Sequence, residues 1–278
     1  MNLTTIRLEQ YQREGLTFDV IDSGPLDGKP FVLLHGFPET NKSWHETAAI
    51  LNGEGYRTFA VNQRGYSLGA QPKNRRDYRS SALVEDVNTL LDIIGQPVYL
   101  MGHDWGAVVA WEVAQRYPAK IQYLITISVP HKAAFMRSML SSNQLFKSYY
   151  IGLFQLPKVP ELLFRKLSKV GRALLKDSGM TDQQLTDFEQ DIVQNNRLTP
   201  ALNWYRAIPF SSSKYLTQPV KVPTLFIWGK NDSAIGEKSI KLNKQYVNAP
   251  YTEIIMDATH WIPVQNAKEL TEHVFATI

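Results

Sequence analysis

One stretch, residues 98–110, constrains the fold more than any other part of this sequence. It consists of a short apolar run, a turn with glycines two positions before and two positions after Asp104, and a helical pattern. Gly102 and Gly106 permit a tight backbone where a strand passes directly into a helix. Asp104 could be an ordinary helix N-cap, but an N-cap does not require both glycines. The stretch therefore predicts a strand, a sharp turn and a helix, with a carboxylate presented at the turn.

Short apolar runs alternate with helical patterns along most of the 278 residues. This alternation predicts an α/β fold, with a mostly parallel eight-stranded sheet and helices on both faces. The expected strands are 4–10, 16–22, 31–34, 57–61, 98–101, 121–127, 222–228 and 251–256. The expected helices are 43–51, 80–94, 105–117, 237–247 and 264–278. Gly95 and Pro118 are the stop signals for the second and third of these helices.

The alternation stops between residues 131 and 212, where the sequence is helical and aromatic with internal proline and glycine. We predict that residues 131–212 form a helical cap inserted into a core domain of residues 1–130 and 213–278. Such a cap would cover the carboxyl edge of the sheet, where ligands of open α/β folds bind. Residues 160–176 place leucines at helical spacing with basic residues between them, a pattern that can lie on membranes. We expect this amphipathic helix to pack on its own domain instead.

Composition excludes several classes of protein and site. The chain has no cysteine, which excludes disulfides, thiolate metal sites and a cysteine nucleophile. The net charge of +4 comes from scattered lysines and arginines that acidic residues nearly match, so we expect no nucleic-acid partner. Residues 1–7 lack the apolar stretch of a signal peptide, and no run approaches the ~18 apolar residues needed to cross a membrane. We therefore expect a cytoplasmic protein without stable membrane insertion.

An aspartate at the sharp turn predicts covalent chemistry of a particular kind. Its side chain has an ordinary pKa of about 3.9 and is an anion at neutral pH, so it needs no base before it attacks. A carboxylate can attack an sp3 carbon directly, and the product is an ester between enzyme and substrate. A histidine is then needed only to activate the water that cleaves the ester. Asp104 is accordingly the predicted nucleophile.

Two later residues complete a triad in the chain order nucleophile, acid, histidine. Asp232 ends the loop after the seventh apolar strand, from which a carboxylate can orient an imidazole. His260 follows the last strand and precedes the final helix. Asp232 alone could be a turn residue, but the pair in this order favours the triad. Among the other histidines, we expect His35 and His103 to flank the site as hydrogen-bonding supports.

The loop after the third strand supplies one amide of an oxyanion hole in this arrangement. We assign that amide to Phe37 and its partner to Trp105, where both would stabilise the oxyanion formed when water attacks the ester. Ser67 lies in a second segment, residues 65–69, that matches the pattern Gly-x-Ser-x-Gly. It is not an expected nucleophile, because no strand runs directly into this segment and no helix follows it. No histidine pattern predicts a metal site, and the chemistry requires no cofactor.

The residues at the predicted site together resemble the epoxide hydrolases of the α/β-hydrolase superfamily. The likeness is carried by His35-Gly36-Phe37-Pro38, Gly102-His103-Asp104-Trp105-Gly106, Asp232 and His260, and it runs over nearly the whole chain. The resemblance implies the α/β-hydrolase fold with an inserted helical cap. It also implies the hydrolysis of a small apolar epoxide by water to a vicinal diol.

The resemblance further implies two cap tyrosines that donate to the epoxide oxygen as the ring opens. Residues 148–157 and 203–206 are similar to the segments that carry them, which assigns the donors to Tyr150 and Tyr205. Tyr149 is an alternative to Tyr150, one position away. With 13 tyrosines in the chain, both segments could also be aromatic packing. The expected substrate pocket includes His35, Pro38, His103, Tyr149, Phe154, Trp204 and Trp261.

Haloalkane dehalogenases share the Asp-Trp turn and are the close alternative. A halide needs only N–H groups around it, whereas an opening epoxide leaves a basic alkoxide that needs an acidic donor. Phe37 stands where many dehalogenases have a side-chain amide, and Trp105 stands where haloacetate dehalogenases have an arginine. Strand 121–127 also ends without the carboxylate that one dehalogenase subgroup uses. A third possibility is a non-catalytic small-molecule receptor, and the chain could be a monomer or a homodimer.

Overall fold

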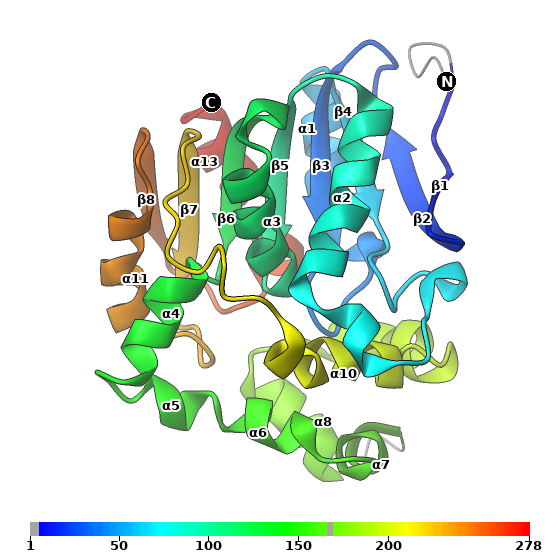
Figure 1. Cartoon of the computed structure of the whole chain (residues 1–278), viewed down its shortest axis with the longest axis vertical. Helices are drawn as coiled ribbons and strands as arrows, with labels where there is room; N and C mark the ends of the chain where they lie inside the picture. Colours follow the sequence, from blue (N-terminus) through cyan, green and yellow to red (C-terminus); the bar gives the residue numbers. More distant parts are fainter. Residues whose placement is uncertain (1–5, 166–168) are drawn as a thin grey trace.

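The computed structural model of this protein describes residues 6–165 and 169–278, and an eight-stranded sheet lies at its centre (Figure 1). The strand order is β1-β2-β4-β3-β5-β6-β7-β8. β2 pairs antiparallel with β1 and with β4, whereas the remaining pairs are parallel. The strands are β1 (Gln10–Arg13), β2 (Leu16–Ser23), β3 (Lys29–Leu34), β4 (Tyr56–Val61), β5 (Val98–His103), β6 (Ile121–Ile127), β7 (Thr224–Gly229) and β8 (Tyr251–Met256). The predicted mostly parallel eight-stranded sheet is confirmed.

Helices cover both faces of the sheet, because successive residues of a buried strand point to opposite sides. In β3, Phe31 and Leu33 belong to the apolar layer under α1, α12 and α13. Val32 and Leu34 belong to the layer under α2 and α3. The helices of the two faces are α1 (His45–Gly53), α2 (Ser80–Ile94), α3 (Trp105–Arg116), α11 (Glu237–Asn243), α12 (Ile262–Gln265) and α13 (Ala267–Phe275).

Between β6 and β7 the chain leaves the sheet and forms a row of helices across the carboxyl ends of the parallel strands (Figure 1). They are α4 (Lys132–Met139), α5 (Gln144–Lys147), α6 (Tyr149–Gln155), α7 (Val159–Arg165), α8 (Lys169–Asp177), α9 (Asp182–Asp187), the π-helical segment Phe188–Gln194 and α10 (Leu198–Arg206). From α4 to α8 each helix packs against the next, and α4 also packs against α11. The site described below lies between this row and the strand ends.

The first strand does not lie where the sequence predicted it. β1 covers Gln10–Arg13 instead of 4–10, of which residues 4 and 5 lie outside the described part. The two-residue turn Glu14-Gly15, with φ of 51° and 76°, joins β1 to β2 and pairs Arg13 with Leu16. Because such a turn sets the register of a hairpin, the strand extends to the turn, beyond the predicted end.

The expected C-terminal helix is divided in the structure. α12 and α13 are separated at Asn266, where φ is −135° and the backbone is not helical. The expected helix 237–247 also ends early, because α11 passes at Asn243 into a 3-10 turn, Lys244–Tyr246. The expected helix 80–94 matches α2 at both ends, and Gly95 terminates it in the left-handed conformation that favours glycine.

The basic segment 160–176 was expected to form one helix and instead contributes to two, α7 and α8, with residues 166–168 outside the described part. Gly171 lets the two helices approach, since a Cβ there would lie 2.5 Å from the backbone oxygen of Leu163. Phe164 and Leu175 are buried, so one side of this segment packs on the protein itself as expected, whereas Leu162 and Val170 are exposed. In the described parts of the chain, no helix is both long enough and apolar enough to cross a bilayer.

Candidate active site

Asp104 lies at a backbone turn that close-packed glycines make possible. Its φ of 51° is in the left-handed region that side chains other than glycine rarely adopt. A Cβ on Gly102 would lie 2.4 Å from the carbonyl oxygen of Gly106, and a Cβ on Gly106 would lie 2.0 Å from that of Leu34. Neither position has room for a side chain. The predicted strand, sharp turn and helix are confirmed by β5, Asp104 and α3.

The Asp104 carboxylate is held on two sides. Its Oδ1 accepts a hydrogen bond from the Phe37 amide at 2.8 Å, and its Oδ2 lies 3.5 Å from Nε2 of His260. Gly36 permits this approach, because a Cβ there would meet the Asp104 Cβ at 2.4 Å. Trp105 is the first residue of α3, so its amide has no acceptor within the helix. Of the two amides expected here, that of Phe37 donates to Asp104 in the structure.

His260 lies between two carboxylates. Its Nδ1 is 2.7 Å from Oδ2 of Asp232, while its Nε2 faces Asp104. The other oxygen of Asp232 accepts hydrogen bonds from the amides of Ala234 and Ile235 at 2.8 and 2.9 Å. Asp232 is therefore fixed by its own loop and in turn orients the imidazole ring. The three residues predicted as a triad lie together, although they come from three separate parts of the chain.

The backbone of His260 is fixed as well. Its carbonyl oxygen accepts a hydrogen bond from Ser128 Oγ at 2.8 Å and lies 2.9 Å from Nε2 of His103. Nδ1 of His103 lies 3.2 Å from the carboxylate of Glu39. Ser128, at the end of β6, has a φ of 68°. Sequence reasoning assigned no role to Ser128 or Glu39, because their contacts with this loop are long-range.

The charges of the site depend on one another. Burial by itself would raise the pKa of Asp104, but the hydrogen bond and positive charge of His260 outweigh burial and lower the pKa. Burial would lower the pKa of His260, yet the carboxylates of Asp232 and Asp104 raise it well above its usual value. Burial, and then the charge of Asp104, raise the pKa of Tyr150 and of Tyr205. The directions of these shifts favour an anion at Asp104, a cation at His260 and protonated phenols at Tyr150 and Tyr205.

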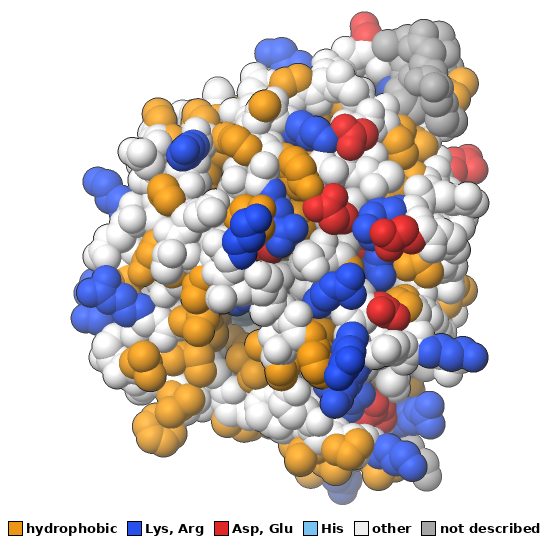
Figure 2. Space-filling model, in the orientation of Figure 1, with side chains coloured by type: hydrophobic (Ala, Val, Ile, Leu, Met, Phe, Trp, Pro, Cys, Tyr) orange, Lys and Arg blue, Asp and Glu red, His pale blue; other side chains and the backbone are white. Residues whose placement is uncertain are grey.

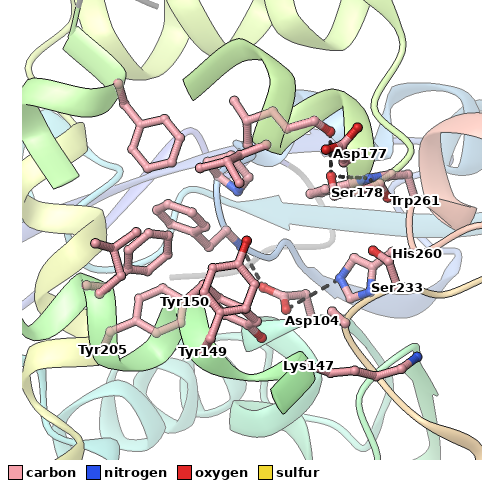
Figure 3. A pocket seen from close by; sticks show the side chains of 18 residues that line it. Asp104, Lys147, Tyr149, Tyr150, Asp177, Ser178, Tyr205, Ser233, His260 and Trp261 are labelled. Carbon is pink, nitrogen blue, oxygen red and sulfur yellow. Dashed lines mark hydrogen bonds and ion pairs between the residues drawn. The ribbon is translucent and has the colours of Figure 1, made fainter. Parts of the chain in front are cut away.

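A cavity of about 260 Å³ lies over Asp104 between the sheet and the row of helices. Figure 3 shows Asp104 with His260 on one side and Tyr149, Tyr150 and Tyr205 on the other. The predicted site residues that line this cavity are Phe37, Pro38, Asp104, Tyr149, Tyr150, Phe154, Tyr205, His260 and Trp261. Asp104 and three tyrosines of the inserted helices thus share one space.

A second cavity, of about 290 Å³, meets the first at Asp104, Tyr150 and Tyr205, which line both. Its other lining side chains are mostly apolar, and Val108 and Met136 are examples from the core and from the row of helices. The three shared residues therefore lie at the junction of two spaces. Tyr149 lines only the first cavity and is 59% exposed, so its surroundings differ from those of Tyr150.

Buried polar contacts fix the two tyrosines relative to each other. Tyr150 is carried by α6 and Tyr205 by α10, and their ring centres are 6.1 Å apart. Gln155, at the end of α6, donates to the backbone oxygen of Tyr205 at 2.7 Å. Arg206 donates to both carboxylate oxygens of Glu161 at 2.7 and 2.9 Å and is 7% exposed. Such a bidentate pair fixes both the distance and the orientation between Arg206 of α10 and Glu161 of α7.

Three predicted pocket residues lie elsewhere. His35 and His103 are fully buried and line neither of the two cavities that meet at Asp104. They act as supports instead, since His35 Nε2 accepts a hydrogen bond from the Gln63 amide. Trp204 lines the second cavity rather than the first, and its indole N–H donates to the Arg64 carbonyl at 2.7 Å.

Ser67 lies in a loop and not at a turn between strand and helix, as the sequence predicted, and its contacts are structural. It is fully buried, its hydroxyl donates to the backbone oxygen of Asn62 at 2.7 Å, and it accepts from the Asp19 amide at 2.8 Å. The hydroxyl thus has partners on both sides and joins the loop to β2. Ser67 lines neither of the two site cavities.

Gln144 and Lys147 of α5 contact the Asp232 loop, and sequence reasoning missed both. Gln144 is fully buried; it donates to the Ala234 carbonyl and accepts from the Gly236 amide, each at 2.7 Å. Lys147 Nζ lies 3.2 Å from the backbone oxygen of Asp232 and lines the first cavity. No local pattern could have predicted contacts across about 90 positions of sequence. Within residues 6–165 and 169–278, no group of three or more His, Asp or Glu side chains could hold a metal ion.

Comparison with known proteins agrees with this architecture. The family described as the alpha/beta hydrolase fold matches residues 29–267, most of the chain. The chain belongs to the α/β-hydrolase family. Its expected α/β-hydrolase fold, with helices inserted between β6 and β7, is thereby confirmed.

Within this family the chain is similar to proteins named epoxide hydrolases. It is 34% identical over 272 residues to epoxide hydrolase 3 of Xenopus tropicalis, covering 93% of this chain and 73% of that protein. It is 34% identical over 265 residues to human epoxide hydrolase 4, covering 89% and 72%. It is also 32% identical to the Bacillus subtilis AB hydrolase superfamily protein YfhM, covering 92% of both chains. The resemblance inferred from the sequence is confirmed by these relatives.

Solved structures agree on the fold. The crystal structure of a Bacillus megaterium epoxide hydrolase with an inhibitor matches with a TM-score of 0.83 at 24% identity, over 96% of this chain and 99% of that one. At this identity the match concerns the fold alone.

Proposed function

We propose that this protein hydrolyses an epoxide to a vicinal diol through a covalent ester on Asp104. The single observation that carries the proposal is a carboxylate at the sharp turn of β5 and α3, with His260 on one side and Tyr150 and Tyr205 on the other. Relatives named epoxide hydrolases support the same substrate class. In this proposal residues 131–212 act as the cap that carries the tyrosines.

In the first step, Asp104 Oδ2 attacks a ring carbon and the carbon–oxygen bond of the epoxide breaks. The electron pair goes to the ring oxygen, which takes a proton from Tyr150 or Tyr205. The other oxygen, Oδ1, keeps its hydrogen bond from Phe37 and becomes the ester carbonyl oxygen. His260, protonated at rest, supplies the proton that restores the phenol. The products are a hydroxy ester and a neutral imidazole.

Loss of the Asp104 charge prepares the second step. That charge raises the pKa of His260 and of both tyrosines, so esterification lowers all three. The phenols become better donors to the new alkoxide, and His260 becomes neutral and able to act as a base. One covalent event thus converts the imidazole from an acid into a base.

In the second step, His260 takes a proton from water while the hydroxide adds to the ester carbon. Phe37 and Trp105 supply the oxyanion-hole amides of the proposal. Collapse of the tetrahedral intermediate expels the diol alkoxide, which takes the proton of the new carboxylic acid. The site returns to a carboxylate at Asp104 and a cation at His260, so one water is consumed and the protons balance.

The substrate is expected to extend to both sides of Asp104. The two cavities meet at that carboxylate, so both ring carbons can carry substituents. Apolar side chains around the second cavity favour a hydrocarbon substituent there.

The decisive experiment is to incubate His260→Gln with an epoxide and to measure intact mass. We expect a stable adduct with the mass of the epoxide on the peptide that contains Asp104, because the ester forms and is not cleaved. Tyr149→Phe is the matched control, which should turn over without accumulating an adduct. No adduct under saturating epoxide would contradict the proposal, and halide release from haloalkanes without epoxide turnover would favour the dehalogenase.

A further inference from the structure

The outer surface of α4–α8 exposes many large apolar side chains. Among the described residues, nine of the fourteen large hydrophobic side chains that are exposed lie between positions 136 and 170. They are Met136, Leu140, Leu145, Phe146, Tyr149, Leu156, Val159, Leu162 and Val170. We call this surface the apolar cap face. Single exposed apolar side chains are ordinary on a protein surface, whereas a large group of them marks an interaction site. The apolar cap face therefore requires an explanation.

The apolar cap face lies at one end of the molecule. Each helix from α4 to α8 packs against the next, so their outer sides adjoin. Figure 2 shows orange side chains gathered along the lower edge, which corresponds to these helices in Figure 1, with blue side chains among them. The exposed fractions are large: 93% for Leu140, 80% for Phe146 and 72% for Leu162.

The same segment carries more positive charge than the whole chain has in net excess. Residues 132–176 contain nine lysines and arginines but a single acidic residue, Glu161. Glu161 is buried in its pair with Arg206. Asp182, which follows the segment, pairs with Arg172 and Lys176 and offsets the charge only at that end. The whole chain has a net charge of +4, so the remainder is negative on balance. The sequence analysis treated the lysines and arginines as scattered, but positive charge is concentrated in residues 132–176.

We infer that the apolar cap face binds reversibly to the surface of an anionic lipid bilayer. Interfacial binding combines apolar side chains that enter the headgroup region with lysines and arginines that attract anionic lipids. A nucleic acid would match the charge and leave Phe146 and Leu162 without a partner. A second copy in a two-fold dimer would place two strongly positive faces against each other. The bilayer is the partner that matches both properties.

The first cavity reaches this face. Tyr149 both lines the cavity and is 59% exposed, and Lys147, from the adjoining helix, lines the cavity as well. Phe146, which is 80% exposed, precedes them in α5. If the proposed function holds, an apolar epoxide dissolved in the bilayer could enter the cavity without crossing water. This part of the inference rests on the proposed function, whereas the binding itself does not.

Vesicle sedimentation tests the binding without any epoxide. The full chain is mixed with vesicles of phosphatidylcholine alone or with about 30% phosphatidylglycerol, the anionic lipid. We expect binding to the anionic vesicles that weakens at high salt, because the attraction of basic residues to the surface is screened. Failure to bind anionic vesicles at low salt would overturn the inference.

Two pairs of variants separate the contributions of charge and apolar contact. Arg165→Glu with Lys169→Glu should reduce partitioning to anionic vesicles by at least about tenfold. The matched control, Lys238→Glu with Lys268→Glu, makes the same change in net charge on exposed residues of the core and should retain binding. An equal loss of vesicle binding in both pairs would overturn the inference, since the net charge of the protein alone would then explain the binding.

Phe146→Ser with Leu162→Ser should also reduce partitioning, by about tenfold. Its matched control, Leu68→Ser with Ile255→Ser, removes exposed apolar side chains elsewhere, 58% and 53% exposed, and should retain binding. Unchanged binding of the Phe146 and Leu162 variant would overturn the inference. The inference would also be overturned if the wild type formed concentration-dependent dimers but bound no vesicles, and if the Phe146 and Leu162 variant abolished those dimers.

Turnover of a small water-soluble epoxide is measured separately on each variant. It should stay unchanged, because none of these residues lines the site cavities. Vesicle binding without turnover would contradict the proposed function alone, and turnover without vesicle binding would contradict this inference alone.

Discussion

The two sides of the site are held by different physical means. On the core side, Asp104 is fixed by backbone contacts so close that Gly102 and Gly106 have no room for a Cβ. On the side of the inserted helices, which we call the cap side, Tyr150 and Tyr205 are fixed by side-chain contacts, including the buried pair of Arg206 with Glu161. Backbone close packing tolerates almost no substitution, whereas side-chain packing can be rebuilt with other residues. The proposed nucleophile is therefore built into the rigid side, and the two proposed proton donors into the adaptable side.

The largest expected effect concerns the core. Asp104→Ala should reduce kcat/KM for an epoxide by about 10⁵-fold, because the proposed ester cannot form. The folded structure should persist, because alanine keeps the backbone and the Cβ of the turn and removes only the carboxylate that contacts Phe37 and His260. Steady-state turnover and circular dichroism check the two expectations. Residual activity within a factor of ten of the wild type would show that another group attacks.

Gly106→Ala tests the core side for stability. The new Cβ would lie 2.0 Å from the carbonyl oxygen of Leu34, so the backbone of β3 or α3 must shift. We expect a loss of about 3 kcal/mol or more in the free energy of unfolding, measured by denaturant titration. An unchanged free energy of unfolding in Gly106→Ala would contradict the view that the core side is rigid and the cap side adaptable.

On the cap side, Tyr205→Phe and Tyr150→Phe should each reduce the rate of ester formation by about 10²-fold, through loss of one proton donor. The double variant should lose more than either single one. Single-turnover measurements of ester formation isolate this step from ester hydrolysis. Tyr149→Phe is the control, with little expected change, and an equal loss in Tyr149→Phe would transfer the donor role from Tyr150.

Coupling between the two carboxylates and His260 can be measured by pH titration. Asp104→Asn should lower the pKa of His260, because one of the two anions that raise it is gone. Proton NMR of the His260 ring checks this directly. In the wild type the protonated ring stabilises the fold fully below its ordinary value of 6.5, and this contribution is lost as pH rises through the raised folded-state pKa. In the Asp104→Asn variant this contribution to stability should be lost at lower pH. An unshifted His260 pKa would contradict the proposed change of His260 from an acid into a base.

The smallest expected effect is a gain in the cap. Gly152 lies within α6, is exposed, and has open space where a Cβ would be placed. Gly152→Ala should therefore stabilise the protein by about 0.5–1 kcal/mol, through the lower backbone entropy of alanine in the unfolded chain. Thermal unfolding measures the gain. Gly15→Ala is the contrasting control, because Gly15 also has open space but a φ of 76°, where alanine is strained.

The sequence by itself determined the elements whose signals are local. Helix α2 was predicted at both ends, and the turn at Asp104 was predicted from its two glycines, because both depend on neighbours within a few positions. The order of Asp104, Asp232 and His260 was sufficient to predict that they would meet, since parallel strands bring their carboxyl ends to one edge. The roles of these residues remain predictions for the experiments above.

Tertiary structure decided what depends on distant contacts. It placed His35 and His103 behind the site instead of in the cavity, because their partners come from loops far along the chain. It gave Tyr149 and Tyr150 different surroundings, since adjacent helical residues point in directions about 100° apart that only the packing of α6 can orient. It also brought exposed leucines of several short helices onto one face. A sequence pattern records spacing along the chain, whereas these outcomes depend on which elements pack together in space.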